Sequence, residues 1–333
     1  MNEQKILVRL PNWLGDAVMA LGFLQALQQQ FPNAQMSVIA KRGIHQLLPF
    51  SPPTQHQFIF DKAAYKGIAG AWRFGKEIAK AERFDLFFSL PDSFSSAVMG
   101  WASGAGQRIG YRNEGRRFLL TQSYAKPQHR HRVAVYKALL ESYTGIKTEP
   151  APIRLHHPFS KQDYIVVNIN SEASSRRLTE AKAVELLTLL ERSVDKKILL
   201  IGAPKEQPFV HGVLKKLPHT KIESVAGKTD LPQLVRLLAS AKVLLTTDSG
   251  PAHMANAVGT HTVVLFGAGN EQETAPYNQD LRTIIRLGEL TCEPCEKNVC
   301  ARYGTPQCLV RLDSAQIVSE VVAQLNKKHE NRF

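Results

Sequence analysis

One pattern constrains the fold of this chain more than any other: a short apolar strand, a polar turn and a helix follow one another repeatedly. Residues 5–10 predict a buried strand, residues 11–16 a turn, and residues 17–30 a helix with apolar side chains at helical spacing. Further strands are predicted at 35–40, 84–90 and 108–111. Such alternation favours a parallel sheet covered by helices.

The pattern starts afresh after residues 150–158, a stretch with three prolines and two histidines that suits a linker. Strands are then predicted at 164–169, 197–201, 222–225, 243–246 and 262–266, and helices at 179–192, 231–239 and 251–258. We therefore predict an α/β fold with two doubly wound, Rossmann-like domains, residues 1–157 and 158–333. A ligand site is expected in a cleft between them, beyond the carboxyl ends of the strands. The final helix could pack back on the first domain.

The charge of the chain indicates an anionic partner. The formal net charge is +13, and residues 1–160 hold 20 Lys and Arg against 10 Asp and Glu. Such a field suits a phosphorylated substrate, an acidic membrane surface or nucleic acid. No helix-turn-helix, zinc-finger or RNA-recognition signature is present, which disfavours nucleic acid. Without a signal peptide or an apolar run long enough to cross a bilayer, we expect a cytoplasmic protein.

A phosphate-binding turn is predicted at residues 246–253, Thr-Thr-Asp-Ser-Gly-Pro-Ala-His, where a strand ends and a helix begins. Ser249 can act as N-cap, Pro251 suits the first helical turn, and Gly250 allows a ligand close to the backbone. Free amides and the helix dipole then face an anion. The alternative is an ordinary capped helix, and His253, one turn in, is expected to be structural or to orient a ligand.

Asp16 lies at the carboxyl end of the first strand, where an acid could serve as general base. Its alternative role is that of an acid favoured by the helix dipole. In the second half, Arg176 and Arg177 follow the first strand in a polar loop. They could neutralise a departing diphosphate in place of a metal, or be merely solvated.

Together these residues resemble the heptosyltransferases that build the inner core of lipopolysaccharide from ADP-heptose, and the heptosyltransferase II group in particular. The resemblance runs over almost the whole chain. Its most specific segments are residues 10–16, 90–97 (Leu-Pro-Asp-Ser-Phe-Ser-Ser-Ala), 108–112 (Arg-Ile-Gly-Tyr-Arg), 226–229 (Ala-Gly-Lys-Thr), 248–253 and the cysteine-containing tail at 292–308.

The resemblance implies a GT-B fold, with the acceptor bound by the N-terminal domain and the donor by the C-terminal one. It also implies an inverting, metal-independent transfer of heptose without a cofactor. Asp16 would accept the proton of the attacking hydroxyl. The implied donor-binding residues are Arg176 at the phosphates, Glu206 near the nucleoside, Ser249 and Gly250 at the diphosphate, and Asp248 and His253 beside them.

The basic cluster of the first half gains a partner from the resemblance, an acidic glycolipid acceptor. The expected acceptor-binding residues are Ser93, Arg108, Arg112, Arg116 and Arg117, with Arg130 and Arg132 in the same region. Interleaved aromatic residues such as Trp101, Tyr111 and Phe118 suit peripheral contact with the inner membrane. A merely solvated face is the alternative.

Two departures from the family pattern, Asn170-Ser171 and the run 176–179 (Arg-Arg-Leu-Thr), fall on the donor side. A divergent member with another nucleotide-sugar donor therefore stays open, as does a nucleotide-sugar epimerase on the same fold. Four cysteines, Cys292, Cys295, Cys300 and Cys308, could hold a structural metal or simply pack. No catalytic metal is expected.

Overall fold

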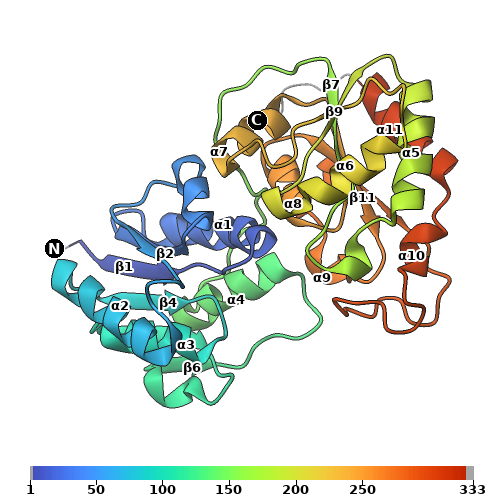
Figure 1. Ribbon diagram of the computed structural model, residues 1–333. Coiled ribbons are helices and arrows are strands. Elements are labelled where there is room, and N and C mark those ends of the chain that lie inside the picture. The colour runs from blue at the N-terminus through green and yellow to red at the C-terminus, as the bar shows by residue number, and fades with distance from the viewer. Residues whose placement is uncertain (1–2, 328–333) are drawn as a thin grey trace. The chain divides into compact units, whose positions relative to one another are not determined.

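The computed structural model describes residues 3–327 and contains two compact units, divided between Ile153 and Arg154 (Figure 1). The division falls inside the proline-rich segment 150–158. Among the described residues, no helix is both long and apolar enough to cross a bilayer.

The first unit is a parallel sheet of six strands in the order β3-β2-β1-β4-β5-β6. Its strands are β1 (Lys5–Arg9), β2 (Gln35–Lys41), β3 (Gln57–Phe60), β4 (Leu86–Ser89), β5 (Gln107–Tyr111) and β6 (Gln122–Tyr124). Its helices are α1 (Leu14–Gln30), α2 (Gly67–Ala81), α3 (Phe94–Ala102) and α4 (Arg132–Thr144), with short 3-10 helices η1 (Ile44–Phe50) and η2 (Arg116–Leu119).

Neighbouring residues of β4 show how helices cover both faces of this sheet. Phe87 packs in a core with side chains of α2 and α3, whereas Phe88 makes edge-to-face contacts with Phe23 of α1 and Tyr143 of α4. Successive strand side chains point to opposite faces, so an entirely apolar strand must be buried on both sides. The short apolar run at residues 86–88 thus dictates a three-layer unit.

The second unit repeats this plan, with a parallel sheet in the order β12-β11-β10-β7-β8-β9. Its strands are β7 (Tyr164–Asn168), β8 (Lys197–Leu200), β9 (Glu223–Ser224), β10 (Val243–Thr247), β11 (His261–Phe266) and β12 (Arg282–Arg286). Its helices are α5 (Glu180–Ser193), α6 (Gln207–Lys215), α7 (Leu231–Ser240), α8 (Gly250–Ala257), α9 (Glu271–Thr274), α10 (Gln307–Val310) and α11 (Ser314–Asn326), with η3 (Ser174–Arg176), η4 (Pro204–Glu206) and η5 (Gln279–Leu281).

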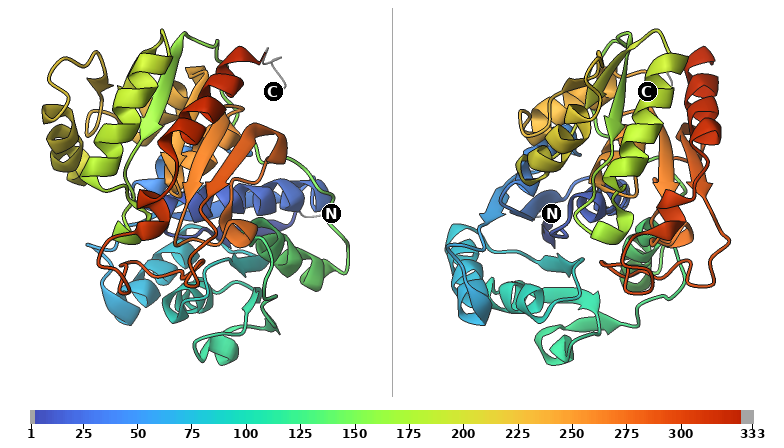
Figure 2. Two further views of the ribbon diagram at one scale, coloured as in Figure 1. Left: turned by 90° about the vertical axis from the view of Figure 1, so that its right-hand side faces the viewer. Right: turned by 45° about the vertical axis from the view of Figure 1, so that its right-hand side comes forward.

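Helix α11 packs against α5 and against β10 and β11, all within the second unit (Figure 2). Its apolar side chains Ile317, Val318 and Val321 join the main core of that unit. Helices α7 and α8 contact each other, and α8 packs on β10 and β11. Both units therefore have the doubly wound, parallel architecture predicted from the sequence.

Candidate functional site

The strand order locates one candidate site in each unit. In the first unit, β1 has β2 on one side and β4 on the other, so the strand order reverses between β1 and β4. In the second unit, β7 has β8 on one side and β10 on the other, so the order reverses between β7 and β10. In open parallel sheets, ligands bind outside the carboxyl ends of strands at such switch points. The candidate sites therefore lie in the segments that follow β1 and β4 in the first unit, and β7 and β10 in the second.

At the end of β1, the buried side chain of Arg9 fixes the loop that leads into α1. Its guanidinium donates to the carbonyls of Leu10 (2.6 Å) and Ile39 (3.2 Å), and to Asn12 Oδ1 (2.5 Å). Burial lowers the pKa of Arg9 to about 10, so it stays charged at neutral pH. The backbone before Asp16 is therefore held from inside the sheet.

Asp16 lies in the first turn of α1, where its carboxylate is partly exposed between a cation and a phenol. Arg132 Nε lies 3.9 Å from Asp16 Oδ1, and the Tyr136 hydroxyl donates to the same oxygen at 3.4 Å. Burial, followed by the charge of Asp16, raises the pKa of Tyr136 well above its ordinary value. Tyr136 thus remains a hydrogen-bond donor to Asp16, whose side chain is 27% exposed.

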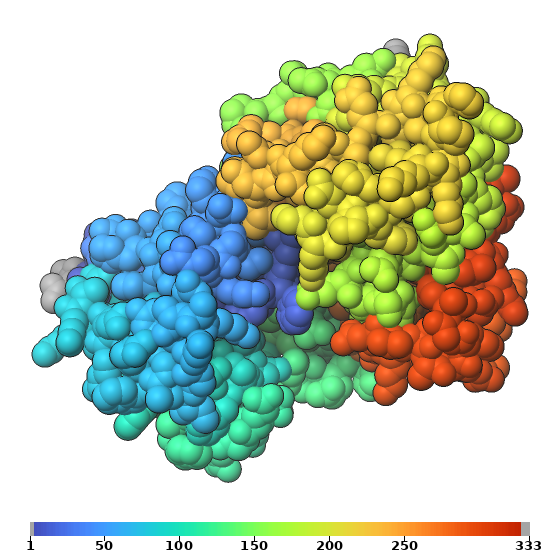
Figure 3. All heavy atoms as spheres, in the orientation of Figure 1, coloured from blue at the N-terminus to red at the C-terminus, as the bar shows by residue number. Residues whose placement is uncertain are grey.

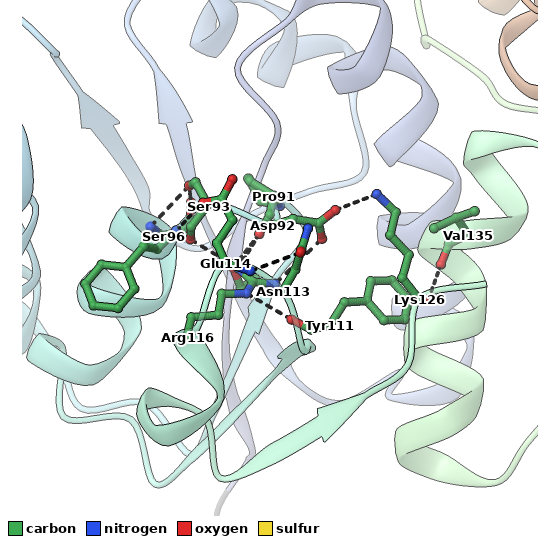
Figure 4. Close-up of polar contacts among 12 residues, drawn as sticks. Pro91, Asp92, Ser93, Ser96, Tyr111, Asn113, Glu114, Arg116, Lys126 and Val135 are labelled. Carbon is green, nitrogen blue, oxygen red and sulfur yellow. Dashed lines mark hydrogen bonds and ion pairs between the residues drawn. The ribbon is translucent and has the colours of Figure 1, made fainter. Parts of the chain in front are cut away.

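At the end of β4, Arg116 organises the segment that carries Asp92 and Ser93 (Figure 4). Its guanidinium is fully buried and donates to Ser89 Oγ (3.0 Å) and to the carbonyls of Pro91 (2.5 Å), Ser93 (3.3 Å) and Tyr111 (2.9 Å). Burial lowers the pKa of Arg116 from its ordinary value, and the charge of Asp92 opposes this change. Arg116 therefore acts on the loop, from beneath it.

Asp92 extends from this loop toward Lys126, whose Nζ donates to Asp92 Oδ2 at 2.5 Å (Figure 4). Arg116 Nη2 lies 3.7 Å from the other carboxylate oxygen. Ser93 is the N-cap of α3 and accepts from the backbone N–H of Ser96. These contacts bring a carboxylate, an ammonium and a hydroxyl to one edge of the first sheet.

The remaining arginines predicted to bind an acceptor differ in their surroundings. Arg108 donates to the carbonyls of Leu119 (2.8 Å) and Ala105 (2.9 Å), which ties β5 to η2. The side chains of Arg112 and Arg117 are exposed. Arg112 and Arg117 can thus meet an anion directly, whereas Arg108 and Arg116 are engaged by the backbone.

In the second unit, polar side chains at the ends of β7 and β10 bond to one another. Asn168 Nδ2 donates to Thr246 Oγ1 (3.1 Å) and Ser249 Oγ (2.9 Å), while Thr247 Oγ1 donates to the carbonyl of Asn170 (2.6 Å). Ser249 occupies the N-cap position of α8, but its side chain makes no cap hydrogen bond. The N-cap position predicted for Ser249 is confirmed, and its hydroxyl donates to the Thr247 carbonyl at 3.1 Å.

Asp248 is a buried acid in front of α8. Arg176 Nη1 lies 3.2 Å from Asp248 Oδ2, and the Asp248 side chain is 5% exposed. Burial raises its pKa to about 6, although the charges of Arg176 and Arg286 oppose the rise. A Cβ at position 269 would lie 2.0 Å from Asp248 Oδ2, so only glycine fits beside this carboxylate.

Arg286, at the end of β12, fixes the segment that surrounds Asp248. Its guanidinium donates to the carbonyls of Gly267 and Gly269 and pairs with Glu271 and Glu293. Arg176 pairs with Asp248, two residues before α8 begins at Gly250, so a guanidinium lies near the N-terminus of that helix. Backbone amides, a helix dipole and a guanidinium are the elements of an anion site.

Close backbone approach marks the end of β8. A Cβ at Gly202 would meet Asn170 Nδ2 at 2.9 Å, and Gly227 has a φ of +72° next to Pro204. Glu206 accepts from the Ala203 N–H at 2.7 Å and so closes the turn at η4. Gly250 is the first residue of α8, and His253 is buried one turn further on.

The four cysteines are free thiols in this structure. Between residues 3 and 327, no three His, Cys, Asp or Glu side chains are grouped so that they could hold a metal ion. Cys308 is buried against the backbone at position 267, and burial raises the pKa of its thiol to about 11. Cys308 therefore contributes packing, whereas the other three cysteines are only partly buried.

Several residues of these sites escaped the sequence analysis, notably Arg9, Asn168 and Arg286. A signal existed for two of them. Arg9 and Asn168 directly follow the buried apolar runs at 6–8 and 164–167, a position that a purely structural strand would fill with another apolar side chain. Arg286 gives no such signal, because β12 is mostly only partly buried and has polar residues at its first two positions, Arg282 and Thr283.

Comparison with known proteins shows the family to which this chain belongs. Residues 71–304 match the family model described as glycosyltransferase family 9 (heptosyltransferase). Lipooligosaccharide heptosyltransferase 2 of Haemophilus ducreyi is 28% identical, with 95% of this chain and 98% of that protein covered.

Two solved structures share the fold over nearly their whole length. Escherichia coli ADP-heptose lipopolysaccharide heptosyltransferase II has a TM-score of 0.82 at 24% identity, with 97% of this chain and 98% of that chain covered. E. coli heptosyltransferase WaaC with ADP has a TM-score of 0.76 at 16% identity, with 96% and 100% covered. The predicted GT-B fold class is confirmed.

Proposed function

Because this chain belongs to glycosyltransferase family 9, the heptosyltransferases, we propose that it transfers heptose from ADP-heptose to the inner core of lipopolysaccharide. One observation supports the proposal most: the carboxyl ends of the strands carry a partly exposed carboxylate, Asp16, in the first unit, and the N-terminus of α8 beside the Arg176–Asp248 pair in the second. A base for the acceptor and a cradle for a diphosphate are the two requirements of this chemistry.

Asp16 is proposed as the general base. The acceptor oxygen attacks the anomeric carbon of heptose, its proton passes to Asp16, and the bond from that carbon to the diphosphate oxygen breaks, which inverts the anomeric centre. The hydrogen bond from Tyr136 and the nearby charge of Arg132 orient the carboxylate. Positioned proton acceptors of this kind contribute about 10²–10⁴-fold to rate.

The second unit is proposed to bind the donor and stabilise ADP as it leaves. The amides at Ser249 and Gly250, the dipole of α8 and the charge of Arg176 would neutralise the diphosphate without a metal. Asp248 and His253 lie beside this position, and Glu206, at the turn that closes on Gly202, is proposed to contact the nucleoside. Donor binding would have to draw Arg176 from its pairing with Asp248.

The first unit is proposed to bind the acidic acceptor glycolipid. Arg112 and Arg117 would meet its phosphates directly, Ser93 would contribute a hydroxyl, and Arg108 and Arg116 would hold the backbone that presents them. In this proposal residues 1–157 serve the acceptor and residues 158–333 the donor. The reaction would take place at the cytoplasmic face of the inner membrane, with the enzyme in peripheral contact.

A different nucleotide-sugar donor is the second candidate. Asn170, one of the two departures from the family pattern, lies on the proposed donor side. Its amide donates to the Ile201 carbonyl at 3.0 Å, beside Gly202 in the proposed nucleotide pocket. Glycosyltransferase chemistry is common to both candidates, and an epimerase is not what the family model describes.

Calorimetric titration of the purified protein with ADP, UDP and GDP, each with and without EDTA, tests the proposal. Selective ADP binding that EDTA leaves unchanged is the expected result. Preference for UDP or GDP would replace the donor, and loss of binding in EDTA would contradict a metal-independent site. Turnover of ADP-heptose, with the anomeric configuration of the product read by NMR, then tests transfer and inversion.

A further inference from the structure

A group of large apolar side chains is exposed on the first unit, away from its core. Ile68 and Trp72 of α2, Trp101 of α3 and Phe118 of η2 are 56%, 43%, 51% and 74% exposed. We call these four residues the aromatic face. Single exposed apolar residues are ordinary on a protein surface, but a contiguous set of this size marks a site of interaction.

The aromatic face lines one continuous groove of about 630 Å³. Its walls are formed entirely by the apolar residues Ile68, Ala69, Trp72, Phe94, Val98, Trp101, Phe118 and Leu119. The base of the groove is rigid because α2 and α3 pack closely: a Cβ at Gly75 would lie 2.6 Å from the Met99 carbonyl oxygen. In Figure 3 the cyan spheres of α2 lie on the visible face of the first unit.

Cationic side chains border the aromatic face. Lys66, Arg73, Lys76 and Arg117 are exposed, and Lys76 Nζ lies 5.7 Å from the centre of the Trp72 ring. Residues 62–83 contain six Lys and Arg against two acids. Both acids are engaged: Glu82 pairs with Lys5, and Glu77 accepts from the Tyr65 hydroxyl.

This combination of chemistries identifies the partner. Tryptophan rings favour the boundary between headgroups and acyl chains, and basic residues beside them are attracted by anionic lipids. Protein–protein interfaces are depleted of lysine relative to the rest of the surface, whereas lysine beside exposed tryptophan is typical of segments that bind anionic bilayers. We propose that the aromatic face docks on the headgroup region of an anionic phospholipid bilayer.

The aromatic face lies next to the proposed acceptor site, and the role we give to docking rests on the proposed function. Phe94, in the wall of the groove, directly follows Ser93 at the carboxyl end of β4, and its ring centre lies 6.0 Å from that of Phe118. A bilayer bound at this face therefore lies next to the proposed acceptor site of the same unit. The acceptor is a glycolipid, so the enzyme would bind it without extracting it from the membrane.

Vesicle co-sedimentation tests the docking, with vesicles of phosphatidylglycerol and phosphatidylcholine that contain neither donor nor acceptor. The apolar variant is Trp72→Ser with Phe118→Ser, and its control is Ile146→Ser with Val299→Ser, two side chains that are similarly exposed elsewhere. The charge variant is Lys66→Gln with Lys76→Gln, and its control is Lys215→Gln with Lys221→Gln, two exposed lysines of the second unit. Unchanged thermal midpoints verify that each variant folds.

The apolar variant is expected to lose vesicle binding by at least ~30-fold. The charge variant is expected to lose roughly 30-fold at low salt, with a smaller loss at 0.5 M salt. Both controls should bind as the wild type does. In a Trp13→Phe background, lipids brominated on their acyl chains should quench the remaining tryptophans, Trp72 and Trp101.

Vesicle binding is measured without donor or acceptor, so failure of the docking proposal can be distinguished from failure of the proposed transferase activity. Absence of wild-type binding, or equal binding by the variants and the wild type, would overturn the proposal. Binding that requires acceptor glycolipid in the vesicle would make the groove part of the acceptor site instead. A wild-type dimer in sedimentation that the apolar variant abolishes would show that a second copy of the chain covers this face.

Discussion

Replacement of Asp248 by asparagine should stabilise the second unit, and by an amount that depends on pH. Burial raises the pKa of this carboxyl from 3.8 to about 6. One pKa unit corresponds to about 1.4 kcal/mol, so the charged form costs about 3 kcal/mol relative to an ordinary aspartate. Asparagine has nearly the same shape and carries no charge, which removes this cost.

The sign follows from proton linkage. Between pH 4 and 6 the folded protein keeps a proton on Asp248 that the unfolded chain has released, so wild-type stability falls as pH rises through this window. Asp248→Asn lacks this loss. Its advantage should therefore be near zero at pH 4, grow up to about pH 6 and stay constant above.

Differential scanning calorimetry between pH 4 and 8 measures this difference. For a unit of this size, 3 kcal/mol corresponds to a thermal midpoint higher by about 6–12 °C at pH 7.5. Asp195→Asn, at an exposed aspartate of the same unit, is the control and should show no such trend. A difference that does not vary with pH, or a wild type that gains on the variant as pH rises, would refute the reasoning.

Three further substitutions separate the proposed roles. Asp16→Asn keeps the hydrogen bond from Tyr136 but removes the proton acceptor, so turnover should fall about 10²–10⁴-fold while calorimetric ADP affinity stays near that of the wild type. Ser249→Ala removes the hydroxyl that accepts from Asn168 and donates to the Thr247 carbonyl. The turn whose amides are proposed to meet the diphosphate is then held less firmly, so ADP binding should weaken roughly tenfold in the same titration. Arg116→Met leaves buried carbonyl groups and Asp92 without their cation, so the free energy of unfolding should drop by about 3–5 kcal/mol. Urea unfolding followed by tryptophan fluorescence measures this change, because Trp13, Trp72 and Trp101 all lie in the first unit.

Different outcomes in the same three variants would contradict the roles of Asp16, Ser249 and Arg116. A large loss of ADP affinity in Asp16→Asn would remove Asp16 from the role of base. Unchanged ADP affinity in Ser249→Ala would mean that the Ser249 hydroxyl plays no part in holding the proposed phosphate site. A stability of Arg116→Met equal to that of the wild type would mean that water replaces the guanidinium without cost.

The fold could be predicted where apolar runs are buried on both faces. The helix predicted at 179–192 is α5, Glu180–Ser193, and the strand predicted at 84–90 contains β4, Leu86–Ser89. The edge strands β3, β6 and β12 escaped prediction because they are only partly buried. An edge strand pairs on one side alone, so its sequence need not contain a long apolar run.

The sequence predicts where the candidate site residues lie along the chain, but not how deeply each is buried or which groups surround it. Asp16 and Asp248 follow strands, which the apolar pattern locates. The burial of Asp248, by contrast, depends on Gly269 and Arg286, which lie far along the chain. Likewise, nothing local distinguishes Arg116, which is buried, from Arg117, which is exposed. Tertiary contacts decide which arginine holds the backbone and which can meet a ligand.

The repeated strand order also bears on how the chain is made. In each unit the strand synthesised first, β1 or β7, ends in the middle of its sheet. One side of β1 pairs with β2 soon after both have left the ribosome, whereas its other side must wait for β4, after α2 has been made. Nascent chains with an open strand edge are prone to aggregate. Translation pauses or chaperone contacts between residues 41 and 86 would therefore decide the yield of folded enzyme.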